Sequence, residues 1–175
     1  MLKEIPILES VLESHALALG SDFTAYRNHT YRVVNLCVAL SSIDQLEKIA
    51  TATAFHDLGI WTDGTFDYLQ PSVRLACDYL ARSGKQQWSS EITEMILEHH
   101  KISSYRGNQK WLVEQLRRAD WVDVSMGLIT FGLSRNLIKE ILSTWPSAGF
   151  HKRLVQLELH RLRTHPWNPL PMVKL

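Results

Sequence analysis

Apolar residues recur at a spacing close to 3.6 along nearly the whole chain, and no stretch alternates between apolar and polar residues as a strand would. This pattern predicts an all-α fold. The expected helices cover about residues 5–18, 21–40, 42–58, 71–82, 89–101, 109–126, 133–144 and 148–163. We expect residues 1–175 to form a single domain, a bundle of about seven or eight helices.

Turn-forming residues separate these helices. Gly59 is expected as the left-handed residue that closes the third helix. A loop with a turn at Asp63 and Gly64 leads to Pro71, which suits the first turn of a helix. Residues 146–175 are expected to hold a last helix and a proline-rich tail that cannot be helical and lies along the surface.

The overall charge excludes two classes of partner. With 19 basic and 18 acidic residues, the net charge of +1 creates no field that would attract a nucleic-acid polymer or a membrane. Residues 1–100 nevertheless carry 7 basic and 13 acidic side chains, and residues 101–175 carry 12 and 5. This gradient reflects either two differently solvated faces or positive charge placed beside an anionic substrate.

The chain also lacks signals for export. No apolar run approaches the roughly 18 residues that a membrane span needs, and the first ten residues lack the layout of a secretory signal. Cys37 and Cys77 have no close partner in sequence, as is usual for free cysteines in a reducing compartment. We therefore expect a soluble, cytoplasmic protein.

Four residues that can bind metal ions lie on or beside apolar helix faces: His29, His56, Asp57 and Asp120. All but Asp57 share the apolar stripe of their helix, and Asp57 lies one position further round at a helix end. Two imidazoles and two carboxylates from three helices make a suitable shell for a divalent ion with open positions. His99 follows the apolar face of another helix.

A simpler interpretation stays open for each residue. A lone histidine on an apolar face is more often hydrogen-bonded within the core than bound to a metal. A buried carboxylate must be paired or bound to a metal, and Arg117 and Arg118 are near enough in sequence to pair with Asp120.

The set of residues is similar to a known signature. His29 within "NHTYRV", His56 and Asp57 within "AFHDLG", and Asp120 within "ADWVD" resemble the H…HD…D pattern of the HD-domain superfamily of metal-dependent phosphohydrolases. The resemblance covers about residues 20–126. It implies an all-α fold that binds metal through these four residues and hydrolyses phosphate esters, often of nucleotides. Some members of this superfamily are di-iron oxygenases or hydratases instead.

The chain departs from the pattern of relatives with two metal ions. Those relatives carry a further histidine at the start of the next helix, where this chain has Pro71, and another later, where it has His99 and His100. The resemblance therefore favours one divalent ion, which could be Mn, Fe, Co, Ni, Zn or Mg. His100 lies roughly 100° around the helix from His99 and is expected at the rim. Asp123 is expected either to hydrogen-bond a ligand histidine or to be an ordinary satisfied polar residue.

Each candidate residue has an expected role in hydrolysis. Asp57 would bind the metal and orient the attacking water, and His99 would protonate the leaving oxygen. Lys101 and Arg106 would bind phosphate, although solvated loop positions explain them equally well. Trp61, soon after the metal motif, is the expected aromatic contact to the substrate.

Three functions follow from this pattern. The first is a metal-dependent phosphohydrolase that acts on a small phosphate ester, such as a nucleotide, through a metal-activated water. The second is a metal-dependent hydratase or lyase for a small neutral molecule. The third is a non-catalytic helical module that keeps the metal for structure. The expected partner is a small molecule, and a homodimer is left open.

Overall fold

Every element of regular structure is a helix within residues 1–168 and 171–173, which are the residues that this computed structural model describes. The α-helices are α1 (Pro6–Ser14), α2 (Ala16–Leu19), α3 (Phe23–Leu40), α4 (Leu46–Phe55), α5 (Gly59–Thr62), α6 (Leu69–Arg82), α7 (Ser89–Glu98), α8 (Val113–Val124), α9 (Arg135–Thr144) and α10 (Phe150–Thr164). Short 3-10 turns are η1 (Gly20–Asp22), η2 (Ile43–Gln45) and η3 (Gln86–Trp88). Eight of these α-helices have nine residues or more, which confirms the predicted all-α bundle.

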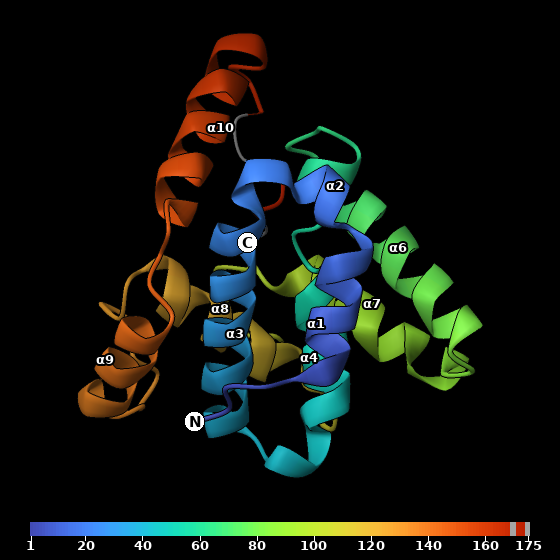
Figure 1. Cartoon of the computed structure of the whole chain (residues 1–175), viewed down its shortest axis with the longest axis vertical. Coiled ribbons are helices and arrows are strands. Elements are labelled where there is room, and N and C mark those ends of the chain that lie inside the picture. The colour runs from blue at the N-terminus through green and yellow to red at the C-terminus, as the bar shows by residue number, and fades with distance from the viewer. Residues whose placement is uncertain (169–170, 174–175) are drawn as a thin grey trace.

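Helix α3 lies in the middle of the bundle, with α8 and α4 packed against it (Figure 1). Helix α7 packs against α8 and α6, and α1 packs against α4. Because α3 is covered on most sides, twelve of its eighteen residues are buried, including the polar residues His29 and Arg32. Such buried polar groups need partners inside the protein, so the centre of the bundle is where a functional site is expected.

The first predicted helix is broken into α1 and α2 at His15. The side chains of Ser14 and His15 both bond to the carbonyl oxygen of Val11, at 2.7 and 2.9 Å. The backbone N–H of His15 donates to Leu12 instead of Val11, in a tighter turn. Local side-chain hydrogen bonds thus replace one α-helical bond and interrupt the helix.

The prediction that Gly59 closes its helix in a left-handed conformation is wrong. Helix α4 ends at Phe55, and Gly59 is instead the first residue of α5, with a negative φ. A glycine is needed there because α6 approaches very closely. A Cβ atom on Gly59 would lie 2.6 Å from the carbonyl oxygen of Tyr68 and 2.9 Å from Cβ of Pro71. The Gly59 N–H also donates to Ser72 Oγ at 3.0 Å, which fixes this contact.

Replacing Gly59 with alanine is therefore expected to destabilise the protein by about 1–3 kcal/mol, the usual cost of overpacking. Denaturant unfolding of the two proteins would measure the change. Gly64→Ala is the matched control: Gly64 has a φ of +61° but no atom within 4 Å of an added Cβ, so this change strains only the backbone. A cost for Gly59→Ala no greater than that for Gly64→Ala would mean that α5 and α6 can separate freely.

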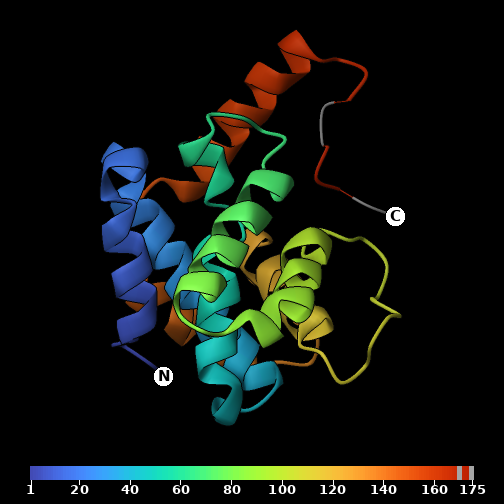
Figure 2. The same ribbon diagram turned by 90° about the vertical axis from the view of Figure 1, so that its right-hand side faces the viewer.

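Residues 99–112, between α7 and α8, are not helical. Helix α7 ends at Glu98 and α8 starts at Val113, so both elements are shorter than predicted. Figure 2 shows the connecting loop extending from the body of the molecule between the two helices. The early end of α7 places His99 and His100 in a turn, where neighbouring side chains need not point 100° apart.

The C-terminal part covers a second, smaller hydrophobic cluster. Met172 from the tail is buried with Ile60, Tyr68 and Leu69, and Leu154 of α10 packs against them. The described tail residues contain no helix, as predicted, but Met172 does not lie on the surface, because its apolar side chain covers this cluster.

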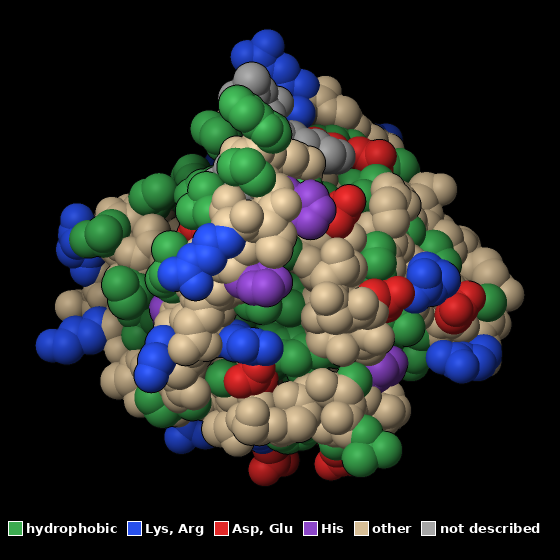
Figure 3. All heavy atoms as spheres, turned by 90° about the horizontal axis from the view of Figure 1, so that it is seen from above, with side chains coloured by type: hydrophobic (Ala, Val, Ile, Leu, Met, Phe, Trp, Pro, Cys, Tyr) green, Lys and Arg blue, Asp and Glu red, His purple; other side chains and the backbone are tan. Residues whose placement is uncertain are grey.

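Figure 3 looks onto the end of the molecule reached by α10, where basic, acidic and histidine side chains are interspersed with hydrophobic ones. None of the helices in the described residues is long and apolar enough to cross a membrane.

Candidate metal centre

The side chains of His29, His56, Asp57 and Asp120 meet at one point inside the bundle, and all four are buried. His29 Nε2 lies 3.0 Å from His56 Nε2, 3.6 Å from Asp57 Oδ2 and 3.7 Å from Asp120 Oδ1. His56 Nε2 lies 3.3 Å from Asp57 Oδ2 and 3.7 Å from Asp120 Oδ1. The structure thus brings together four potential ligands from α3, α8 and the end of α4, as the spacing in the sequence predicts.

The end of α4 explains how two consecutive residues reach one point. The helix stops at Phe55, and residues 56–58 form a turn. Consecutive residues on a regular helix point in different directions, whereas this turn directs both His56 and Asp57 inward. Gly59 then permits the close approach of α6 that fixes the position of the turn.

The buried histidines His29, His56 and His99 all direct Nε2 toward the cluster. In each of them Nδ1 contacts a protein acceptor: Asp123 Oδ2 for His29 (2.7 Å), the Thr53 carbonyl for His56 (2.7 Å) and the Ile96 carbonyl for His99 (2.6 Å). An Nδ1–H that donates to such an acceptor leaves Nε2 for a metal and fixes the orientation of the ring. Three Nε2 atoms are therefore oriented toward the cluster.

Several ligand atoms of the cluster lack any hydrogen-bond partner although they are buried: Asp57 Oδ1, both carboxylate oxygens of Asp120, and His99 Nε2. Unsatisfied buried carboxylate oxygens are costly and call for a positive partner. Arg117 and Arg118 do not provide it, because both guanidinium groups donate to Glu114. The simpler interpretation of Asp120 as the partner of an arginine is therefore wrong, and the donor set fits a divalent cation.

The charges within the cluster support this fit. Burial alone would lower the pKa of His56, but the carboxylates of Asp57 and Asp120 outweigh it and raise that pKa to about 10. Burial would raise the pKa of Asp57 and of Asp120, but the histidines outweigh it and lower both values. Both carboxylates are thus ionised at neutral pH, and the cluster requires positive charge, which protons or a cation can supply.

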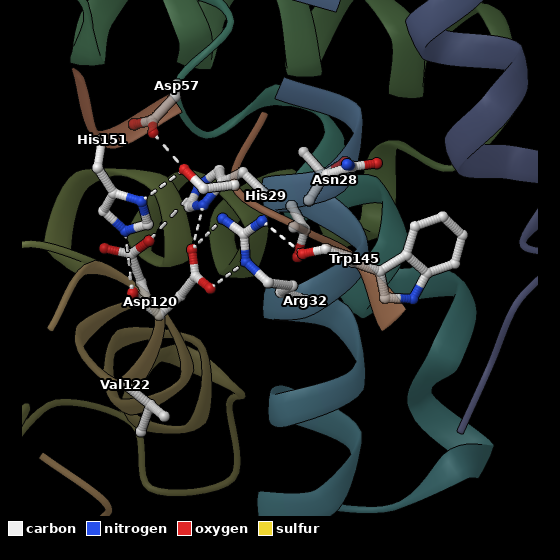
Figure 4. A network of polar contacts seen from close by, with 12 residues as sticks. Asn28, His29, Arg32, Asp57, Asp120, Val122, Trp145 and His151 are labelled. Atoms are coloured by element: carbon white, nitrogen blue, oxygen red, sulfur yellow. Dashed lines mark hydrogen bonds and ion pairs between the residues drawn. The ribbon is translucent and has the colours of Figure 1, made fainter. Parts of the chain in front are cut away.

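Asp123 supports the cluster from behind. Its Oδ2 accepts from His29 Nδ1 and from Arg32 at 2.9 Å, and its Oδ1 accepts from Arg32 Nε at 2.5 Å. Figure 4 shows His29 and Arg32 extending from α3 toward Asp120. Phe150 of α10 stacks on the His29 ring, with centroids 4.0 Å apart. Of the two roles open for Asp123, the structure thus shows the hydrogen bond to a potential ligand histidine.

A second group of potential ligands shares Asp57 with the first. Asp57, His99 and His100 offer ligand atoms that all lie within 4.8 Å of one another. His99 Nε2 lies 3.3 Å from Asp57 Oδ1, and His100 Nδ1 lies 3.5 Å from Asp120 Oδ2. His100 is thus oriented toward the cluster instead of away from it, because α7 ends at Glu98 and does not continue through His100 as the periodicity predicts.

Tyr68 is a further residue that sequence reasoning missed. Its hydroxyl contacts His100 Nε2 at 2.7 Å, and its side chain is almost wholly buried. Burial and the nearby Asp57 carboxylate raise the pKa of Tyr68 well above its usual range, so it is a hydrogen-bond donor at neutral pH. No signal in the sequence distinguished this tyrosine, because its contact with His100 depends on how α6 packs beside the end of α7.

The predicted substrate contacts lie elsewhere. Lys101 and Arg106 line a separate surface cavity, which contains none of the clustered residues, and Lys101 Nζ lies 3.4 Å from Glu98. Trp61 packs against Tyr26, with ring centroids 4.7 Å apart, and its Nε1 donates to Asp22 at 3.0 Å. The structure does not bring these three residues to the cluster, so their role in substrate binding stays a prediction from the sequence.

A cavity of about 390 Å³ adjoins the cluster instead. Tyr68, His100 and Trp121 form part of its wall, together with residues of α10 and the tail. Its lining is mostly apolar and includes no lysine or arginine.

Comparison with known proteins agrees with this geometry. The HD domain matches residues 26–125, more than half of the chain, and this region contains all four clustered residues. Neither the curated proteins nor the solved structures contain a significant match to the chain. The chain belongs to the HD-domain family, the superfamily of metal-dependent phosphohydrolases.

Proposed function

We propose that this chain is a metal-dependent hydrolase that cleaves a small phosphate ester. The observation that carries the proposal is a buried cluster of carboxylates and imidazoles in which Asp57 Oδ1, both oxygens of Asp120 and His99 Nε2 have no hydrogen-bond partner. A divalent ion held there by His29, His56, Asp57 and Asp120 supplies acidification of water and polarisation of a phosphoryl oxygen. The family membership supports the same reaction class.

The side chains of the site suit the proton transfers of hydrolysis. Asp57 Oδ1 accepts no hydrogen bond from the protein and can accept one from the attacking water, which orients the water toward phosphorus. His99 Nε2, 3.3 Å from Asp57, can deliver a proton to the leaving oxygen as its bond to phosphorus breaks. The attacking water gives up a proton and the leaving alcohol gains one, so the reaction is balanced.

A second candidate is a hydratase or lyase for a small neutral molecule, which one observation favours. The cavity beside the cluster has no lysine or arginine in its lining, so it offers no cation for a second phosphate group or another charged part of a substrate. A neutral substrate would fit such a lining equally well. A third candidate, a module without catalytic activity, predicts tight metal binding and no turnover.

The test is a panel of phosphate monoesters and nucleotides assayed with Mn, Fe, Co, Ni, Zn or Mg added to chelator-treated protein. We expect turnover with at least one metal, loss of turnover when chelator is restored, and competitive inhibition by inorganic phosphate. Elemental analysis of the same samples would count one or two ions per chain. Bound metal with no turnover of any ester, or turnover of a neutral substrate that phosphate does not inhibit, would contradict the proposal.

A further inference from the structure

The apolar cavity beside the metal centre lies between α10, the end of α8, the segment before α6 and the tail. Its apolar walls include Phe66, Tyr68, Trp121, Val124 and Leu154, and its volume is about 390 Å³. This size lies within the ~300–1,000 Å³ that small-molecule sites occupy. The lining also contains His100, His151 and the acidic Glu158, but no lysine or arginine.

Two histidines in the wall of the cavity also contact residues of the metal centre. His100 lies in its wall, and its ring joins the cavity to the cluster: Nε2 contacts the Tyr68 hydroxyl at 2.7 Å, and Nδ1 lies 3.5 Å from Asp120 Oδ2. His151 lies in the wall as well, and its Nε2 contacts the carbonyl oxygen of Asp123 at 3.2 Å. A molecule in the cavity would thus have one end against His100 and His151, which separate it from Asp120 and Asp123.

We propose that this cavity binds the apolar part of the substrate while the reacting group lies at the metal centre. The substrate class is then a small phosphate monoester of an apolar alkyl or aryl alcohol, rather than an ester with a second phosphate or an anionic alcohol. This inference rests on the proposed phosphohydrolase function for the reacting group. The apolar contact itself rests on the cavity alone.

The tail forms one wall of this binding site. Met172 is only 4% exposed and packs against Tyr68 and Ile60, and Val173 also lines the cavity. Residues remote in sequence from the metal-binding motif therefore set the length of the apolar group that fits. This accounts for the burial of a methionine in a proline-rich segment that sequence reasoning placed on the surface.

The competing occupant is a second copy of the chain. Val155, Leu159 and Leu162 of α10 are exposed at helical spacing, as in a helix that pairs with another. Only Val155 of these three lines the cavity, however, and the cavity ends at side chains that contact Asp120 and Asp123. An interface between copies does not require such a connection to a metal centre, whereas a substrate does.

The test compares n-hexyl phosphate with ethyl phosphate on the metal-loaded protein. The two leaving alcohols have nearly the same acidity, so a difference in kcat/KM reports binding of the longer chain rather than chemical reactivity. Because each buried methylene contributes favourably, we expect kcat/KM for the hexyl ester to be at least about tenfold higher. Equal values for the two esters would overturn the inference and leave the proposed function intact.

Val155→Trp places a large ring at the mouth of the cavity on a side chain that is 53% exposed, so the fold is expected to tolerate it. We expect the ratio of hexyl to ethyl kcat/KM to fall toward one in this variant. Leu17→Trp is the matched control, since Leu17 is fully exposed on α2 and outside the cavity, and it should keep the original ratio. A Val155→Trp protein with an unchanged ratio would contradict the inference.

Binding of 1-naphthol, followed by tryptophan fluorescence, tests the cavity without any catalysis. We expect the unaltered protein to bind it and Val155→Trp to bind it at least about fivefold more weakly. Binding of 1-naphthol would support the apolar site even if no phosphate ester is hydrolysed. The apolar site and the proposed function can therefore fail independently of one another. No binding of 1-naphthol, together with a dimer in sedimentation that Val155→Trp disrupts, would assign the cavity to an interface between copies.

Discussion

Asp120→Ala protein is expected to lose the divalent metal that the unaltered chain retains when it is purified without chelator. Asp120 contributes two buried carboxylate oxygens that have no hydrogen-bond partner, so the ion loses a negatively charged ligand. His56→Ala should have the same effect. Because a metal ion provides several kcal/mol of transition-state stabilisation, turnover should fall by roughly a thousandfold or more in both variants.

Measuring the free energy of unfolding distinguishes the loss of a metal ligand from a general destabilisation of the fold. In the presence of chelator, Asp120→Ala should lose some stability but still unfold in one cooperative transition, because the neighbouring histidines hold the pKa of Asp120 low and so stabilise its carboxylate in the folded chain. Added metal should raise the free energy of unfolding of the unaltered chain by about 2.7 kcal/mol at a hundred times its Kd, and that of the variant by almost nothing.

Asp63→Ala is the matched control for these measurements. Asp63 lies in the loop soon after the metal motif but is exposed and paired with Arg74. Its removal should leave the metal content unchanged. If Asp120→Ala and His56→Ala also retain one metal ion per chain, the clustered residues are ordinary polar groups of the core and the proposed function fails with them.

The cluster of potential metal ligands could be predicted from the sequence because its signals are local. His29 and Asp120 interrupt apolar stripes of regular helices, and the spacing alone places them inside. His56 and Asp57 are adjacent, so one turn positions both. The number and order of the helices follow from the same periodicity. These features need no knowledge of which helices pack together.

The features that sequence reasoning missed depend on packing between distant segments. Gly59 is required by the approach of α6 rather than by its own φ, and no local pattern distinguishes the two cases. Tyr68 and His100 meet across 32 positions in the sequence. Met172 enters the cavity wall from a tail whose prolines indicate only that it is not helical. The substrate contacts predicted at Lys101 and Arg106 lie outside this cavity.

Arg32→Met is expected to destabilise the protein by about 3–5 kcal/mol, the usual cost of removing one partner from a buried ion pair. Arg32 is 1% exposed and Asp123 is fully buried. Burial alone would raise the pKa of Asp123, but His29 and Arg32 outweigh it and lower that pKa to about 2. At neutral pH the variant would therefore bury a carboxylate that has lost its permanent positive partner. Arg74→Met, which removes an exposed arginine from Asp63, should have only a small effect.

The double variant Arg32→Met/Asp123→Asn separates the structural role of this pair from its role at the metal centre. Because it buries no unpaired charge, it should recover about 1–3 kcal/mol of the loss measured for Arg32→Met in denaturant unfolding with chelator present. Its metal affinity should nevertheless stay about 10–100-fold below that of the unaltered chain, since a neutral amide is a weaker acceptor for His29 Nδ1–H than the carboxylate is. Recovery of both stability and metal affinity would mean that the charge of Asp123 serves only to balance Arg32. Recovery of stability alone would mean that the buried charge is retained to hold His29 in the orientation and tautomer that metal binding requires.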